Sequence, residues 1–429
     1  MKKIAILVFF TVGFFVHVWA CTGLIAGKQA TVDGSVLVTY SADSHTLYGA
    51  LTSSPAADWP KGSMRSIVEW DTNKPLGEIE QVEHTYAVMG NMNEHQLTVV
   101  ESTWGGRPEL VDTTGIIDYG SLMQLALERA KTAREAIKVM TGLVKKYGYY
   151  SSGESFTIAD PNEAWILDLI GKGPGRRGAV WVAVRIPDDC IAGHANYPRI
   201  HKIPMDDKEN CLYSPDVISF AREMGYFDGL NKDFSFARAY SPADFGALRA
   251  CDARVWSFFR KYDSTMDNYL PYVNGESAEP FPLYVKPSRK LSVQDMKEAM
   301  RDHFEDTPFD MTQDVGAGPF KVPYRFRPMS FEVDGKSYCM ERAIATQQTG
   351  FTLVGQMRNW LPDPVGGVLW FGVDDANTCV YIPMYCGITQ VPECFSPENG
   401  SMYDFSWTSA FWIHNWVANM AYARYEPMI

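Results

Sequence analysis

The stretch CTGLIAGKQATVDGSVLVTYSAD, residues 21–43, is the part of the sequence that most clearly indicates a fold. Apolar residues lie on both sides of the Asp33-Gly34 pair, and Asp-Gly between two apolar runs is a favoured hairpin turn. We therefore predict two antiparallel strands in this stretch. Cys21 begins the first of them, and we expect that strand to form the edge of a β-sheet.

Residues 1–20 have the pattern of a secretory signal peptide. Two lysines precede an apolar run that is too short to cross a bilayer as a helix. Val18 and Ala20 occupy the small-residue positions of a cleavage site, so cleavage after Ala20 would make Cys21 the first residue of a secreted or periplasmic protein. Two alternatives stay open. Either cleavage falls elsewhere and Cys21 is an ordinary buried cysteine, or Cys21 is lipidated, although Trp19 stands where lipoprotein signals favour small residues.

Composition and charge argue against several classes of function. The chain has 429 residues, 46% of them hydrophobic and 13% aromatic, so residues 21–429 form either two globular domains or one large layered domain. A formal net charge of -12 without a basic patch argues against nucleic acid as a partner. No later apolar stretch approaches the length of a membrane span, so we expect no stable membrane insertion after the leader is removed.

The spacing of cysteine and histidine gives no sign of a metal or another cofactor. Eight cysteines occur without a CxxC pair, which argues against a zinc or redox motif. His194 and His201 are seven residues apart around a proline-containing loop, which is a poor spacing for two metal ligands. We therefore expect no cofactor. The sequence leaves the disulfide pairing and a homo-oligomeric state open.

Blocks of strand pattern alternate with blocks of helix pattern along the chain. Short apolar runs indicate a strand over 97–100 and a hairpin over 155–171 and 178–187. Apolar residues recur at helical spacing over 121–130, and a second helix follows over 132–148. Strands, a helix pair and further strands predict sheet layers covered by helices, which is an α+β fold.

Capping signals mark the ends of two helices. Thr132 and Glu135 form a predicted capping box, and Gly148 is placed to end the same helix. Ser292 is the predicted N-cap of a helix in SVQDMKEAMRDHF, within a region over 205–330 that otherwise reads as loops around helices.

A cysteine at the start of a mature chain carries a nucleophile and a base on one residue. The α-amino group has an ordinary pKa of about 7.7–8.0, so near neutral pH part of it is free to take the proton of the Cys21 thiol. The thiolate can then attack an amide carbonyl, form an acyl-thioester and release an amine, before water hydrolyses the thioester. Leader cleavage would be the activating step, because until then that nitrogen is an amide without basicity.

Several motifs occur in order over nearly all of residues 21–429, among them CTGLIAGKQATVDGS, MNEHQLTVVESTWGGR, GESFTIADPNEAWILDLIGKG, GHANYPRI and WLPDPVGGVLWFGVDD. They closely resemble peptidase family C69, the secreted dipeptidases related to dipeptidase A. The resemblance implies an N-terminal nucleophile hydrolase with a four-layer αββα sandwich, distantly related to choloylglycine hydrolases and penicillin V acylases. Family members often run further at the C terminus. Residues 407–429 have a helical pattern without a visible cap, so we expect the chain to be incomplete there.

The resemblance assigns roles around the amino group. Cys21 matches the nucleophile. In YSAD, Asp43 is retained from the Arg-x-x-Asp of the wider superfamily, while Tyr40 stands where the arginine would be. Asp43 is expected to orient the Cys21 amino group, the alternative being that it caps a turn. Asn196 in GHANYPRI matches an asparagine that helps to hold the amino group and the substrate, the alternative being a turn-stabilising role.

The remaining assignments concern the substrate side of the site. Arg254 is similar in placement to a late active-site arginine of the superfamily, the alternative being a surface or ion-paired helix residue. Thr103 aligns with an asparagine of choloylglycine hydrolases, so its backbone N–H is the expected oxyanion-hole donor. Asn93 and Glu101 are expected to shape the neighbouring turn and strand. Glu154 either recognises the amine of the substrate or is a surface carboxylate.

The leading interpretation is a secreted cysteine dipeptidase that acts on dipeptides. A second enzyme interpretation is an amidase that acts on another N-acyl bond, such as that of a bile-acid conjugate or a penicillin-type side chain. A third interpretation is a lipid-anchored surface protein that binds a partner without catalysis.

Overall fold

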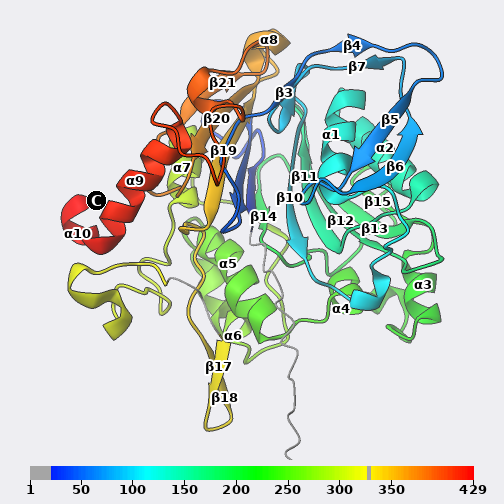
Figure 1. Cartoon of the computed structure of the whole chain (residues 1–429). Coiled ribbons are helices and arrows are strands. Elements are labelled where there is room, and N and C mark those ends of the chain that lie inside the picture. The colour runs from blue at the N-terminus through cyan, green and yellow to red at the C-terminus, as the bar shows by residue number, and fades with distance from the viewer. Residues whose placement is uncertain (1–20, 326–329) are drawn as a thin grey trace, which may run out of the picture.

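The computed structural model describes residues 21–325 and 330–429 (Figure 1). Helices and strands both contribute substantially, and the two large sheets are antiparallel, so the predicted α+β class is confirmed. The predicted signal peptide, residues 1–20, lies outside the described residues. Within the two described ranges, every helix is too short or too polar to cross a bilayer.

The strand that follows Cys21 lies inside a seven-stranded sheet. β1 (Thr22–Ala26) pairs with β2 (Val36–Asp43), which confirms the predicted hairpin, and on its other side with β14 (Ile191–His194). The prediction of an edge strand is therefore wrong, because β14 covers the other side of β1. The sheet order is β16-β14-β1-β2-β19-β20-β21, and its remaining strands are β16 (Tyr284–Val285), β19 (Thr349–Met357), β20 (Val368–Val373) and β21 (Ile382–Tyr385).

A second sheet has eight antiparallel strands in the order β15-β13-β12-β11-β10-β9-β8-β3. Its strands are β3 (Ser53–Ser54), β8 (Val88–Met89), β9 (Met92–Asn93), β10 (Thr98–Trp104), β11 (Gly153–Ala159), β12 (Ala164–Gly171), β13 (Ala179–Ile186) and β15 (Cys211–Tyr213). Three small two-stranded sheets complete the strands of the described residues: β4 (Ala57–Asp58) with β7 (His84–Thr85), β5 (Met64–Val68) with β6 (Pro75–Glu80), and β17 (Ser330–Val333) with β18 (Lys336–Cys339).

The two large sheets pack face to face around one apolar core (Figure 1). Side chains alternate along each strand, so Ile25 of β1 and Val38 of β2 enter this core together with Val100 and Ile166 of the other sheet. Their neighbour Leu24 points away from it and packs with the helices on the outer face. Both faces of these strands are therefore buried, which is why their sequences are continuous apolar runs.

Helices cover both outer faces. α1 (Tyr119–Arg129) and α2 (Ala133–Tyr147) pack on the eight-stranded sheet, whereas α5 (Ala253–Arg260) and α7 (Val293–Met300) pack on the seven-stranded sheet. The layers thus follow one another as helix, sheet, sheet and helix. The other α-helices are α3 (Val217–Glu223), α4 (Phe236–Tyr240), α6 (Leu270–Val273), α8 (Asp363–Gly366), α9 (Ala410–Ala423) and α10 (Tyr425–Met428).

The capping predictions hold with one correction. The side chain of Thr132 accepts the backbone N–H of Glu135, and Gly148 ends α2 with φ 80°. The Glu135 carboxylate, however, accepts the backbone N–H of Lys131 and not that of Thr132, so the reciprocal half of the predicted box is absent. At α7 the box is complete, because Ser292 and Asp295 each accept the backbone N–H of the other.

Candidate active site

The thiol of Cys21 is buried where β1 begins. Its sulfur lies 3.6 Å from the hydroxyl oxygen of Tyr40 on β2, and the backbone N–H of Asp43 donates a second hydrogen bond to it. Burial, followed by the charges of Glu101 and Asp43, raises the pKa of the thiol well above its usual range, while the hydrogen bond from the backbone of Asp43 opposes that rise. The resting residue is therefore a neutral thiol, which needs a base before it can attack a carbonyl.

Arg254 of α5 holds the backbone of the nucleophile. Its Nη1 donates to the carbonyl oxygen of Cys21 at 2.8 Å and to Oγ1 of Thr22 at 2.7 Å. Its Nη2 donates to Oδ1 of Asn196 at 2.7 Å. Burial lowers the pKa of Arg254 to about 10, which still leaves it a cation at neutral pH. The arginine is thus buried in the site and is not a surface residue.

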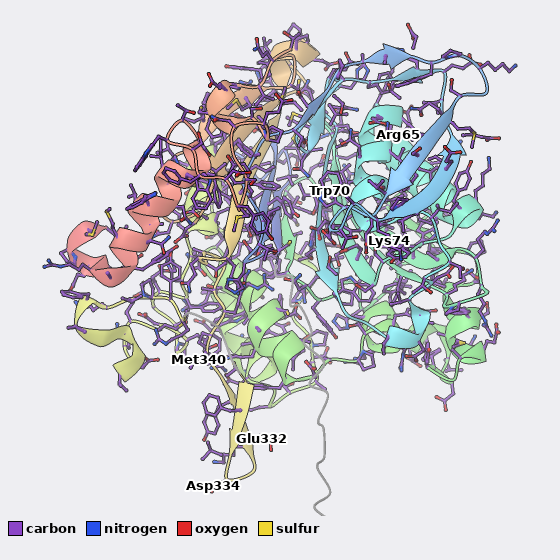
Figure 2. The ribbon with its side chains drawn as sticks, in the orientation of Figure 1. Arg65, Trp70, Lys74, Glu332, Asp334 and Met340 are labelled. Carbon is purple, nitrogen blue, oxygen red and sulfur yellow. The ribbon has the colours of Figure 1, made fainter. Side chains whose placement is uncertain are left out.

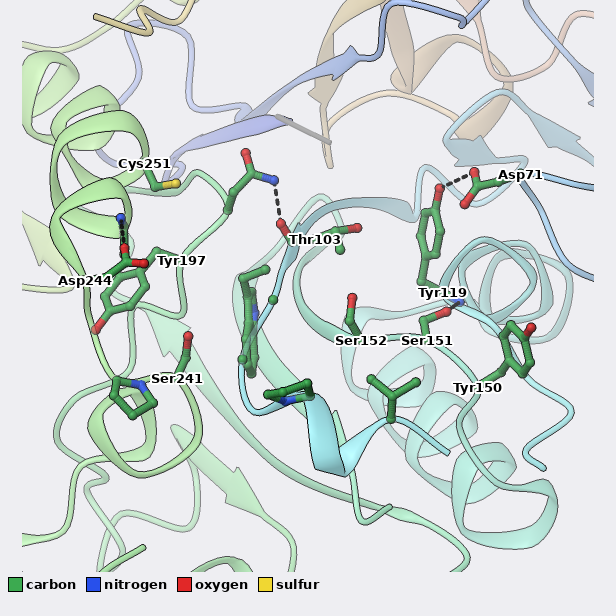
Figure 3. A pocket seen from close by; sticks show the side chains of 18 of the residues that line it. Asp71, Thr103, Tyr119, Tyr150, Ser151, Ser152, Tyr197, Ser241, Asp244 and Cys251 are labelled. Carbon is green, nitrogen blue, oxygen red and sulfur yellow. Dashed lines mark hydrogen bonds between the residues drawn. The ribbon is translucent and has the colours of Figure 1, made fainter. Parts of the chain in front are cut away.

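Asn196 connects β14 to the end of β10. Its backbone is left-handed, with φ 56°, and its N–H donates to Oγ of Ser102 at 3.1 Å. Its Nδ2 donates to the backbone carbonyl of Thr103 at 2.5 Å, the bond drawn beside the label Thr103 in Figure 3. The Asn196 side chain therefore bonds to both Arg254 and Thr103, so these three predicted site residues lie next to one another. The oxyanion role of the Thr103 N–H stays a prediction.

Asp43 is held by a set of donors that come mainly from distant parts of the chain. Its carboxylate forms an ion pair with Arg342 and accepts hydrogen bonds from Thr349 at 2.7 Å and from Ser41 at 3.1 Å. All of these groups are buried. Arg342 thus supplies a cation beside the Asp43 carboxylate. Orientation of the Cys21 amino group by Asp43 stays a prediction.

Two buried glutamates, Glu101 and Glu154, lie near the Tyr40 hydroxyl, which bonds to the first of them. The Tyr40 hydroxyl donates to Oε1 of Glu101 on β10, and the Thr103 hydroxyl donates to Glu154 on β11 at 2.5 Å. The strand register places Glu101 diagonally opposite Glu154, and each has one buried oxygen without a donor. Burial is the main cause that raises the pKa of Glu101 to about 7 and that of Glu154 further. One proton shared between the two carboxyls would satisfy both free oxygens.

His194 is the histidine nearest to the start of β1 in the strand register, where it pairs with Gly23. Its two ring nitrogens lie 2.6 Å from Oγ of Ser102 and 2.9 Å from Oγ1 of Thr157. Burial lowers the pKa of His194 to about 3, so the ring is neutral and both nitrogens are engaged. A side chain at Gly23 would place its Cβ 2.9 Å from this ring, which explains the glycine beside the nucleophile. His194 therefore has a structural role.

Two cavities meet beside these residues. One has a volume of about 310 Å³ and is lined by Cys21, Tyr40 and Asp43, and the other has a volume of about 750 Å³ and is lined by Thr103 and Asn196. Both are also lined by Asp71 and Tyr119, whose side chains are joined by a hydrogen bond of 2.8 Å in Figure 3. The nucleophile thus faces the smaller cavity, and the larger cavity continues from it.

Among the described residues, no three histidine, cysteine, aspartate or glutamate side chains are grouped as a metal site requires. The chemistry of the site is that of a thiol surrounded by carboxylates, a phenol and a guanidinium. This set can hold and ionise a nucleophile and can move protons, which are the needs of acyl transfer.

The sequence profile of peptidase family C69 matches residues 20–429. The chain belongs to peptidase family C69. Among proteins similar to this C69 peptidase are a "Probable dipeptidase" of Latilactobacillus sakei, 24% identical over 95% of this chain and 82% of the relative, and a "Probable dipeptidase" of Salmonella dublin, 27% identical over 86% and 81%. "Dipeptidase A" of Lactobacillus helveticus is 24% identical over 95% of this chain and 82% of its own length.

The structure of this C69 peptidase brings all five sequence-predicted site residues into one region. Sequence reasoning missed four others: the Tyr40 hydroxyl beside the sulfur, Arg342, Asp71 and Tyr119. It also assigned Glu101 only to the shape of a strand. Of the two alternatives left open for Glu154, the surface carboxylate is wrong, because Glu154 is fully buried. Asn93 does shape its turn, because Oδ1 accepts the backbone N–H groups of residues 95 and 97.

The raised pKa of Glu101 predicts a stability effect. As pH rises from about 4.5 to about 7, the unfolded chain releases this proton while the folded protein keeps it, so folding becomes less favourable. Glu101→Gln removes this loss and still offers an oxygen to Tyr40. We expect the variant to unfold about 3 °C or more above the wild type at pH 8, and the difference to shrink towards pH 4.5.

Thermal unfolding followed by circular dichroism between pH 4.5 and pH 8 measures this effect. Glu332→Gln, on strand β17 of the exposed β17–β18 hairpin labelled in Figure 2, is the matched control and should follow the wild type. A Glu101→Gln protein that is less stable than the wild type at pH 8 would show that Glu101 is ionised and stabilising in the folded state.

Proposed function

We propose that this peptidase is a secreted cysteine dipeptidase in which Cys21 is both the nucleophile and the N-terminal residue of the mature chain. The observation that carries the proposal is the placement of Cys21, whose thiol lines a cavity of about 310 Å³ while Arg254 holds its carbonyl oxygen. The names of the relatives support dipeptides as the substrates. The helix-sheet-sheet-helix order, with the nucleophile on an inner strand, supports an N-terminal nucleophile hydrolase fold.

The proposed reaction begins when the α-amino group of Cys21 takes the thiol proton. The thiolate then attacks the carbonyl carbon of the peptide bond, and the oxyanion is stabilised by the backbone N–H of Thr103. The ammonium returns its proton to the peptide nitrogen, the C–N bond breaks, and the C-terminal amino acid leaves. Water attacks the acyl-thioester with the same amine as base, which releases the N-terminal amino acid and restores the thiol.

The surrounding residues position these groups in the proposed mechanism. The hydrogen bond from the backbone N–H of Asp43 to the sulfur favours the thiolate once it forms. The Asp43 carboxylate, already fixed by Arg342 and Thr349, orients the new ammonium group. Removal of residues 1–20 creates that amine, and the protein is exported in the same step.

A substrate panel tests this function against its alternatives. Purified protein with its N-terminal mass measured is incubated with L-leucyl-L-alanine, a glycine-conjugated bile acid and penicillin V. We expect free leucine and alanine from the dipeptide and at least about 100-fold lower turnover of the other two. Preferred turnover of either amide would favour the amidase interpretation, while a lipid adduct on Cys21 without any turnover would favour a binding protein.

A further inference from the structure

The cavity that holds the nucleophile is acidic. Its charged lining residues are Asp43, Asp71 and Glu101, and the described residues that line it include no lysine, arginine or histidine. Asp43 is already paired with Arg342, and Glu101 is bonded to Tyr40 and holds its proton more tightly than an ordinary glutamate. Asp71 is the carboxylate of this cavity that remains free to meet a cation brought by a ligand.

Asp71 is held in place at the junction of the two cavities. It follows β5, and the Tyr119 hydroxyl of α1 donates to its Oδ1 at 2.8 Å (Figure 3). The preceding residue, Trp70, donates its backbone N–H to Asp118 at 2.7 Å and lies beside α1 in Figure 2. Gly120 allows this approach, because a Cβ there would lie 2.4 Å from the Trp70 ring. The Asp71 carboxylate is thus oriented, lines both cavities and belongs to a residue that is exposed to solvent.

We propose that Asp71 is the binding residue for the α-ammonium group of the substrate, so that the enzyme acts on peptides with a free N-terminal amine. This inference rests on the proposed function. The carbonyl carbon that Cys21 attacks lies about 2.5 Å from the α-nitrogen of the same residue. The group that binds the ammonium must therefore face the cavity of the thiol, as Asp71 does and Glu154 does not.

The same cavity has an apolar wall suited to the side chain of that N-terminal residue. Leu51, Met123, Leu127, Phe351 and Phe371 all line it. The α-carbon next to the attacked carbonyl carries both the ammonium group and the side chain. In this arrangement the ammonium binds Asp71 and the side chain packs on the apolar wall. The substrate class is therefore a peptide that begins with an unblocked apolar residue.

The acidity of Asp71 sets a pH limit on this binding. Desolvation by the surrounding protein is the main cause that raises its pKa to about 6, with contributions from the charges of Asp118 and Glu69, while the hydrogen bond from Tyr119 opposes the rise. Glu101 faces the same cavity. In the free enzyme Asp71 becomes neutral as pH falls through about 6, so KM for a dipeptide should rise below that pH.

Steady-state kinetics of the full chain with Asp71→Asn tests the assignment. The substrates are L-leucyl-L-alanine, its C-terminal amide and its N-acetyl derivative. In the wild type we expect the N-acetyl compound to have a kcat/KM at least about 100-fold lower. Asp71→Asn should raise KM about 10- to 100-fold, and by the same factor, for the two substrates that carry an ammonium, with a smaller change in kcat.

Controls separate this role from damage to the fold. Asp71→Glu should restore part of the lost affinity, and Asp244→Asn, in the larger cavity only, should leave KM unchanged. Alkylation of Cys21 by iodoacetamide, mapped by mass spectrometry, should proceed at the wild-type rate in Asp71→Asn. Equal turnover of free and N-acetylated dipeptide by the wild type, or an unchanged KM in Asp71→Asn, would overturn the role of Asp71 and leave the proposed dipeptidase function standing. A wild type with no dipeptide turnover would overturn the proposed function and this inference with it.

Discussion

Replacing Cys21 with alanine is expected to lower dipeptide turnover by roughly 10³-fold or more, because the variant lacks the thiol that forms the acyl-thioester in the proposed mechanism. His194 is neutral with both ring nitrogens bonded, and Tyr40 already donates its proton to Glu101. The fold should survive, since the change removes only a sulfur atom and typical single substitutions cost about 1 kcal/mol. Turnover and thermal unfolding are measured on the same preparation.

The control for this prediction is Cys394→Ala, which removes an exposed thiol far along the chain from β1. This variant should keep wild-type turnover and lose only one site of alkylation. Substantial hydrolysis by Cys21→Ala, with the N-terminal mass confirmed, would exclude Cys21 as the nucleophile. Loss of activity together with loss of the folded state would instead assign Cys21 a structural role.

Local structure was predictable from the sequence because it depends on neighbours along the chain. The β1–β2 hairpin followed from an Asp-Gly turn between apolar runs, and the end of α2 followed from Gly148. The position of β1 in its sheet was not predictable in the same way. Its second partner, β14, has only four residues and comes from a segment about 170 residues later, so no local pattern revealed that it covers the edge.

Motifs predicted the nucleophile, the arginine that holds its backbone and the asparagine bonded to that arginine, whereas no motif predicted the charged partner of Asp43. Cys21, Asn196 and Arg254 stand in recognisable stretches, and in the structure Arg254 donates hydrogen bonds to both of the others. The ion pair of Asp43 with Arg342 joins residues that are 299 positions apart. The sequence alone does not distinguish a buried strand carboxylate such as Glu154 from a surface one. The distinction requires its neighbour across the sheet, Glu101, which is distant in the sequence.

In the proposed mechanism the α-amino group of Cys21 is the catalytic base. A form of the chain with a specific protease site directly before Cys21 should fold but be nearly inactive, because the nitrogen of Cys21 is then an amide without basicity. Cleavage that exposes Cys21 should restore turnover. A matched form that keeps one alanine before Cys21 after the same cleavage should stay inactive, which separates the free amine from removal of the extension.

The decisive measurement is the rate of L-leucyl-L-alanine hydrolysis before and after cleavage, with the intact mass of the protein determined at each stage. We expect activity to increase by roughly 10²-fold or more as the N terminus of Cys21 is exposed, and we expect no increase in the form with the extra alanine. Equal activity before and after cleavage would contradict this mechanism, because the thiol proton would then have to pass to another base, of which Glu101 behind Tyr40 is the nearest candidate.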